Sequence, residues 1–250
     1  MASTLRATRR SARAGSRRPA KTLAPPAGRA PESSVAAYRE LRDAITGGRF
    51  QPNERLVEAD LARMLGAGRT AVRAALVRLD QEGLVNREPN RGARVRLVSD
   101  REALEIEEVR VSLEQLLVRR AAMNVTPADL RDLRQSLDAM RERVAQGDPL
   151  GYSELNARFH QRIWAISNNQ TARRLVANLK SQSIRFQYRT ILRPGRTEES
   201  LEEHEAIWAA LAAGDPDAAE AAMRTHLSQV VSTLKWSIES QTRPASWLPG

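Results

Sequence analysis

Cysteine is absent from this chain of 250 residues. Its absence excludes disulfide bonds, thiolate zinc sites and thiol nucleophiles, so only nitrogen and oxygen ligands remain for a metal ion. The chain also lacks any run of about 18 apolar residues. Its N-terminus does not have the continuous apolar core of a secretory signal. We therefore expect neither a membrane span nor export, and we expect a cytoplasmic protein.

Acidic residues are scarce at the N-terminus, although the chain as a whole carries 30. The residues before Val35 hold eight basic groups and one acid, whereas those from Ser99 onward hold 20 basic and 21 acidic groups. Few large apolar side chains occur before Val35, so we expect residues 1–34 to form a disordered basic arm. A solvated tail is favoured over a DNA-contacting arm, and a transit peptide is a third possibility. The concentration of basic charge indicates an anionic partner near the N-terminal half.

Apolar spacing predicts a compact helical unit within residues 35–98. The expected helices run from Val35 to the glycine pair at 47–48, from Glu58 to Leu65 and from Arg69 to Glu82. A glycine-containing break at 66–68 separates the second and third helices, giving a helix-turn-helix. Two short strands, Leu84-Val85 and Ala93 to Leu97, are predicted around a loop with Pro and Gly, giving a wing.

Two arginines begin the third predicted helix. Arg69 and Arg73 lie four residues apart and share one helix face, beside the apolar stripe. Arginine can bond guanine edges in the major groove, and the hydroxyl of Thr70 can bond a phosphate oxygen. Taken alone, the residues support a DNA-reading role and an ordinary surface role for Arg69 and Arg73 equally.

The sequence motifs around these arginines closely resemble those of the GntR family. The resemblance covers about a quarter of the chain and implies that Arg69 and Arg73 contact bases, while the wing residues Asn90, Arg91 and Gly92 enter the minor groove. The sequence departs from the family at Gly68 and Ala71, where Ser or Thr and Pro are usual, which puts a phosphate contact in doubt. The matching motifs are Leu56-Val57-Glu58-Ala59-Asp60-Leu61-Ala62, Leu65-Gly66, Arg69-Thr70, Val72-Arg73, Ala75-Leu76, Arg78-Leu79, Glu82-Gly83-Leu84-Val85 and Pro89-Asn90-Arg91-Gly92-Ala93.

Residues 99–240 contain no convincing strand pattern. Helix starts are expected at Thr126-Pro127 and Asp215-Pro216, because a Thr or Asp cap followed by Pro suits a first turn. Helix ends or breaks are expected at Gly147, Asn168-Asn169, Pro194-Gly195 and Gly214. We expect roughly six helices in an antiparallel bundle, followed by a flexible tail over residues 241–250. The predicted fold class is therefore mainly α: an N-terminal winged helix-turn-helix plus a C-terminal all-helical antiparallel bundle.

All three histidines fall in the predicted bundle. Asn156 and His160 are neighbours at helical spacing, and His204 and His226 lie on later helices that could face them. Such a set could hold a divalent metal ion, zinc or similar, with open coordination positions. Taken alone, the residues favour histidines that are hydrogen-bonded polar groups of the bundle over histidines that bind a metal.

This half of the chain resembles the FCD ligand-binding domain of the FadR-like GntR subgroup. The resemblance implies that Asn156, where Asp is common, and the three histidines bind a divalent metal. It also implies that a small organic acid contacts the metal and Arg110, and we assign the matched Asn169 to the effector as well. The matching residues are Glu108-Val109-Arg110-Val111-Ser112-Leu113-Glu114, Asn156-Ala157-Arg158-Phe159-His160, Asn169, His204, Ala210-Leu211, Gly214-Asp215, Ala218-Ala219, Met223 and His226-Leu227.

Arg110 could instead pair with Glu107 or Glu114 at helical spacing, which contributes little at a surface. We favour the effector role, because a planar guanidinium matches a carboxylate in a dry pocket. Trp164, Trp208 and Phe159 are expected in the core.

The sequence therefore predicts a ligand-responsive regulator that binds double-stranded DNA, with release of a repressor by a small organic acid as the favoured mode of control. The family resemblance implies that it acts as a homodimer, whose two-fold symmetry would match a pseudo-palindromic operator. The alternatives are a metal-dependent helical hydrolase and a direct metal sensor. Catalysis is disfavoured because Glu205, next to His204, is poorly placed as a general base.

Overall fold

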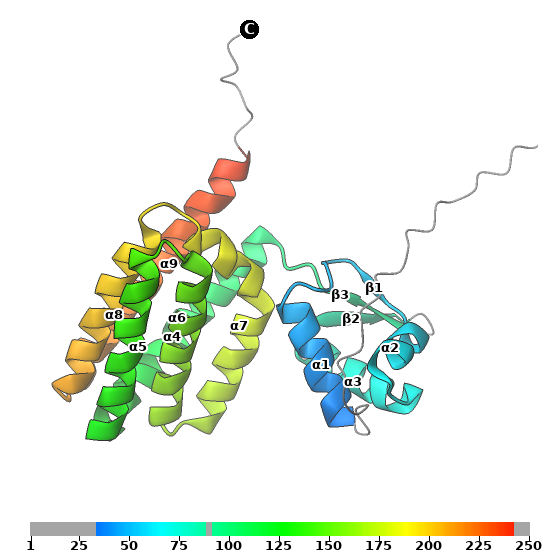
Figure 1. The fold of residues 1–250 in the computed structure, drawn as a ribbon, viewed down its shortest axis with the longest axis horizontal. Helices are drawn as coiled ribbons and strands as arrows, with labels where there is room; N and C mark the ends of the chain where they lie inside the picture. The colour runs from blue at the N-terminus through cyan, green and yellow to red at the C-terminus, as the bar shows by residue number, and fades with distance from the viewer. Residues whose placement is uncertain (1–33, 89–91, 243–250) are drawn as a thin grey trace, which may run out of the picture.

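The computed structural model describes residues 34–88 and 92–242, which form two packed halves (Figure 1). The first half holds three helices and a small sheet, and the second half is a helical bundle. The helices are α1 (Ser34–Thr46), α2 (Glu58–Leu65), α3 (Arg69–Gln81), α4 (Asp100–Asn124), α5 (Pro127–Ala145), α6 (Pro149–Ile166), α7 (Gln170–Ile191), α8 (Arg196–Ala212) and α9 (Pro216–Thr242); the strands are β1 (Arg55–Leu56), β2 (Val85–Glu88) and β3 (Gly92–Val95).

The N-terminal half has its own apolar core, to which α1, α2, α3 and the sheet all contribute. Leu41, Leu76 and Leu79 are fully buried in it, at the helical spacing that the sequence shows. The strand order is β1-β3-β2 and both pairings are antiparallel. The predicted helix-turn-helix and wing hairpin are confirmed, and α3 packs against α1, α2 and β2.

Strand β1 was not predicted. Its Leu56 pairs with Ala93 of β3, so the wing hairpin gains a third strand. Gly92 explains how the two segments approach: its φ is +87°, and a Cβ there would lie 2.3 Å from the carbonyl oxygen of Leu56. Only glycine fits such a position without shifting the backbone.

The C-terminal half is the predicted bundle, with α4 to α9 as its six helices in the described chain. Four turns fall at predicted breaks, where a residue has positive φ: Gly147, Asn168, Gly195 and Gly214. Thr126 forms a capping box with Asp129 at the start of α5. Within residues 34–88 and 92–242 no helix is both long and apolar enough to cross a membrane.

Candidate DNA-reading surface and candidate metal centre

The outward face of α3 carries the predicted DNA-contacting residues. Val72 and Leu76 are buried, whereas Arg69, Thr70 and Arg73 are exposed near the N-terminal end of the helix. The N-cap is Gly68, which forms no side-chain hydrogen bond to the helix. The first-turn N–H groups therefore have no side-chain cap and point toward solvent, where a phosphate could bond them.

Arg73 is held in place by an acid from the preceding helix. Its Nε and Nη2 donate to the carboxylate of Glu58, at 3.2 and 2.9 Å. The hydrogen bond from Arg73 lowers the pKa of Glu58, so the acid is ionised at neutral pH. About 63% of the Arg73 side chain remains exposed, which leaves donors available to DNA. Asn90 and Arg91 of the predicted wing contact lie outside the described residues, and Gly92 begins β3.

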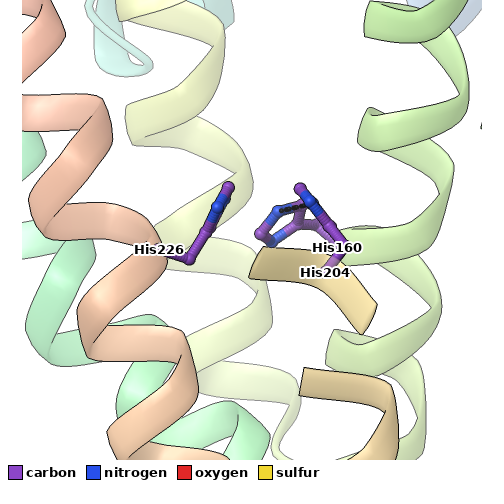
Figure 2. A group of neighbouring side chains, drawn as sticks. All are labelled: His160, His204 and His226. Atoms are coloured by element: carbon purple, nitrogen blue, oxygen red, sulfur yellow. Dashed lines mark hydrogen bonds between the residues drawn. The ribbon is translucent and has the colours of Figure 1, made fainter. Parts of the chain in front are cut away.

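The three histidines meet in the interior of the bundle. Figure 2 shows His160 of α6, His204 of α8 and His226 of α9 turned toward one another. Each side chain is at least 97% buried, and one ring nitrogen from each lies within 4.8 Å of the other two. The Oδ1 of Asn156, on α6, lies 2.9 Å from Nε2 of His204. The structure thus brings together all four residues that the sequence suggested as metal ligands.

Each histidine has a partner on its other ring nitrogen. Nδ1 of His160 lies 2.7 Å from Glu114, Nδ1 of His226 lies 2.7 Å from Glu203, and Nδ1 of His204 lies 2.5 Å from the carbonyl oxygen of Ser200. Carboxylates and carbonyls behind the ring are typical of metal-ligating histidines, because they fix the tautomer and the ring orientation.

These partners indicate where the ring protons are. Because the carbonyl oxygen of Ser200 only accepts, Nδ1 of His204 carries the proton, and the carboxylate of Glu114 favours the same tautomer for His160. The two Nε2 atoms, 3.1 Å apart, then face each other as acceptors, and Oδ1 of Asn156 is a third. Three acceptors without a proton between them repel one another unless a cation lies among them. The donor set therefore fits a divalent metal ion.

Burial keeps the imidazoles neutral. It lowers the pKa of His204 and of His226 well below the ordinary value, and repulsion from His160 adds to both shifts. Burial also lowers the pKa of His160, although Glu114 partly opposes the effect. Neutral imidazole is the form that binds a metal, so no proton must first be removed at neutral pH.

A cavity of about 40 Å³ lies against this cluster. Its lining combines charged and polar side chains with apolar ones, as expected for a small-molecule site. The lining residues are Glu107, Arg110, Asn156, His160, Lys180, Phe186, Gln187, Thr190, Ile191, Arg196, Ser200, His226, Val230 and Leu234.

Arg110 lines the cavity and also makes both of the helical pairs considered for it. Its Nη1 donates to Glu107 at 2.7 Å and its Nη2 to Glu114 at 2.7 Å. The pairs are buried, with 10% of the Arg110 side chain exposed, so the surface setting assumed for this alternative does not apply, and the pairs coexist with a place in the cavity wall. Burial opposes ionisation of Glu114, but its contacts with His160 and Arg110 outweigh this and hold its pKa well below the usual range.

Asn169 does not line the cavity. It is the N-cap of α7, and its Oδ1 accepts a hydrogen bond from the backbone N–H of Ala172 at 3.1 Å. A cap satisfies one of the free N–H groups of a helix start, and that explains an asparagine at this position. The structure therefore does not bring Asn169 together with Arg110 and the histidines at this cavity, and its contact with an effector stays a prediction.

Sequence reasoning missed a second set of charges behind the site. Arg196, which is 2% exposed, forms two hydrogen bonds to Glu203, at 3.1 and 2.8 Å, and Glu203 in turn bonds His226. The pattern Arg110–Glu114–His160 is thereby repeated on other helices. The seven-residue spacing of Arg196 and Glu203 could have shown that they share a helix face, but not that the face is buried.

Helix α7 joins the cavity to the N-terminal half. Ser183 donates to Glu107 at 3.2 Å, while the adjacent Gln182 donates to the carbonyl oxygen of Glu82 at 2.9 Å. Gln182 also accepts from Arg96, just beyond β3, at 2.9 Å. Glu82 is the residue that ends α3. The adjacent residues Gln182 and Ser183 of α7 therefore contact the C-cap of α3 and the cavity wall, respectively.

Two family models match the chain. The model described as bacterial regulatory proteins, gntR family, matches residues 33–95, and the FCD domain matches residues 105–229. The Escherichia coli K12 repressor RspR is 29% identical over 198 residues, covering 79% of this chain and 87% of that protein. The putative L-lactate dehydrogenase operon regulatory protein of the same strain is 31% identical over 218 residues, covering 77% and 83%.

Solved structures show the same architecture. Escherichia coli McbR/YncC superposes with a TM-score of 0.71 at 25% identity, covering 82% of this chain and 98% of that one. A putative GntR regulator from Rhodococcus sp. RHA1 superposes with a TM-score of 0.64 at 27% identity, covering 81% and 97%. This chain belongs to the GntR family: it is a transcription regulator with a DNA-binding helix-turn-helix and an FCD effector-binding domain.

Proposed function

We propose that this regulator is a repressor, that it binds a pseudo-palindromic operator as a homodimer, and that a small organic acid releases it. The carrying observation is the cavity in which Arg110 and two of the three clustered histidines line one wall. A buried cationic group beside converging ring nitrogens suits a carboxylate. The name of RspR, a transcriptional repressor, supports repression over activation.

The candidate ligands for a divalent ion, zinc or similar, are Asn156, His160, His204 and His226. When bound, the ion supplies positive charge and open coordination positions for an acidic ligand. Glu114 and Glu203 hold the rings of His160 and His226 in place from behind.

Exposed apolar side chains on α4 support a homodimer. Val109, Leu116 and Met123 follow one another at seven-residue spacing, and 50%, 43% and 71% of each is exposed. Residues at this spacing share one helix face. A second copy packed on this face would bury the stripe and place two α3 helices on the two half-sites of an operator.

We infer that α7 transmits the effector signal, because Gln182 contacts the end of α3 and Ser183 contacts the cavity wall. Gln182→Ala should leave operator affinity in the absence of acid close to that of the wild type. It should reduce the acid-induced loss of affinity severalfold, from the roughly 5- to 150-fold that is typical of coupled sites. Titrations of labelled operator with and without the acid measure both quantities.

The exposed Gln135 on α5 provides the matched control, since Gln135→Ala removes the same side chain far from the cavity wall. An unchanged acid response in Gln182→Ala would contradict transmission through this contact.

The rival functions are less well supported. A hydrolase needs a free general base near the metal, but Glu114 and Glu203 each bond a histidine and an arginine, and Glu205 pairs with Arg141 at the surface. A direct metal sensor would respond to the ion alone. A shift in DNA affinity caused by a carboxylate at fixed metal concentration would exclude that alternative.

The test is selection of genomic DNA fragments by the purified protein at near-physiological salt, where non-specific binding through phosphate contacts is weak. We expect enrichment of one palindromic site with metal bound, and release of that site by acids related to the neighbouring genes. Failure to enrich any site, with metal and without it, would contradict the proposed operator binding.

A further inference from the structure

Three cationic side chains line the cavity, and two of them already have carboxylate partners. Arg110 is bonded to Glu107 and Glu114 through all three guanidinium nitrogens. Arg196 is bonded to Glu203 through both of its terminal nitrogens. These guanidinium groups are therefore largely occupied by neighbouring residues.

The third cation is Lys180 on α7. Among the residues that the structure describes, it has no ion pair and no hydrogen bond, and its nearest recorded contact is the ring of Trp164, 5.7 Å from Nζ. Burial lowers its pKa to about 8, and the charge of Arg110 adds to this, while Glu114 and Glu107 oppose it. Lys180 is only partly exposed, and a cation that has lost much of its water without gaining an ion-pair partner gains more from an incoming anion than a fully exposed one.

The charges around the cavity favour a ligand with two negative groups. The three cations, Arg110, Lys180 and Arg196, balance the three carboxylates within the site, those of Glu107, Glu114 and Glu203; Arg196 also lies 4.0 Å from Glu199, whose side chain is half exposed. A metal ion binds imidazole in its neutral form, so histidines that hold one add no charge to this sum. A divalent ion would leave an excess of two positive charges in a buried site, and a dianion would neutralise it.

We propose that Lys180 binds a second anionic group of the effector, which makes the effector a short dicarboxylate. This inference rests on the proposed binding of an organic acid in the same cavity. The first carboxylate lies toward Arg110 and the histidines, and the second meets the Lys180 ammonium. The cavity volume of about 40 Å³ favours the shortest dicarboxylates, and side chains around it must move to admit one.

The experiment is calorimetric titration of the metal-loaded full-length protein with oxalate, malonate and succinate, and with acetate and propionate as one-charge counterparts. We expect the wild type to bind oxalate more tightly than acetate, or malonate more tightly than propionate, by about tenfold or more. This is the size of effect that a charged hydrogen bond contributes. Lys180→Met should remove this preference, and Lys180→Arg should retain much of it. Arg174→Met, which removes an exposed positive charge from the same helix, should leave it unchanged.

Metal content by elemental analysis and thermal unfolding show that each variant is folded and loaded. A dicarboxylate preference that survives in Lys180→Met overturns the inference. An equal loss of affinity for mono- and dicarboxylates also overturns it, because Lys180 would then contact the single carboxylate of any acid. If the metal-loaded wild type binds none of the five acids, the proposed organic-acid site itself fails together with this inference.

Discussion

Replacing Arg69 or Arg73 by alanine should abolish specific operator binding and leave the fold intact. Both side chains are exposed on the outer face of α3, so their removal costs no core packing. Glu58 orients the Arg73 guanidinium in advance, which reduces the entropy lost when it bonds a base.

The size of the effect follows from dimer symmetry. Each well-formed arginine–guanine pair provides about 1–3 kcal/mol of discrimination, and a dimer uses two copies of it. The loss is therefore about 2–6 kcal/mol, or roughly 30-fold to 10⁴-fold in Kd. Fluorescence anisotropy with the selected operator and a scrambled duplex of the same length measures specific and non-specific affinity.

The control must remove one positive charge from the chain without touching α3. Arg174→Ala does so, because Arg174 is exposed on α7 in the helical half. We expect it to bind both duplexes like the wild type, whereas the α3 variants should bind the operator no better than the scrambled duplex. Wild-type operator affinity in Arg69→Ala or Arg73→Ala would exclude α3 as the reading element.

Local patterns predicted the elements of the fold well, because most of them are long and are marked at their ends. The helix starts at Pro127 and Pro216 and the break at Gly195 were readable from capping and turn chemistry. Strand β1, Arg55–Leu56, was not readable, since two residues cannot show an alternating pattern. It exists only because β3 offers it an edge.

The sequence analysis named the candidate ligands of the site but missed the charged residues that lie behind them. Resemblance to a known domain pointed to His160, His204 and His226, but nothing in the sequence indicated that Glu203 and Arg196 would lie behind them. Their positions depend on how α8 packs on α9, which is a tertiary property. Asn169 illustrates a related point: the sequence does not distinguish a residue that caps a helix start from one that contacts a ligand, and the fold shows Asn169 as the cap of α7.

His204→Ala should lose both the bound metal and the response to acid. The side chain is fully buried, and its Nε2 lies 3.1 Å from Nε2 of His160 and 2.9 Å from Oδ1 of Asn156. Its removal takes away the candidate ligand that contacts both His160 and Asn156. Elemental analysis of the purified variant measures the metal, and operator titrations with and without acid measure the response.

The metal should also stabilise the folded protein. At a free metal concentration 100 times Kd, binding contributes about 2.7 kcal/mol. For a chain of this size that corresponds to roughly 5–10 °C in Tm, which chelation should remove from the wild type. His204→Ala should unfold at the same temperature with and without chelator, because it has little metal to lose.

A cavity left by alanine could weaken the fold by itself, so a second variant is needed. His204→Gln keeps most of the volume but replaces the imidazole with a weaker ligand, and it should also lose the effect of chelation. Asn156→Asp should act in the opposite direction, since a carboxylate adds one negative charge beside Nε2 of His204. Undiminished metal content in both His204 variants would contradict the proposed site, because a metal ion held by Nε2 of His204 binds more weakly once that ligand is gone.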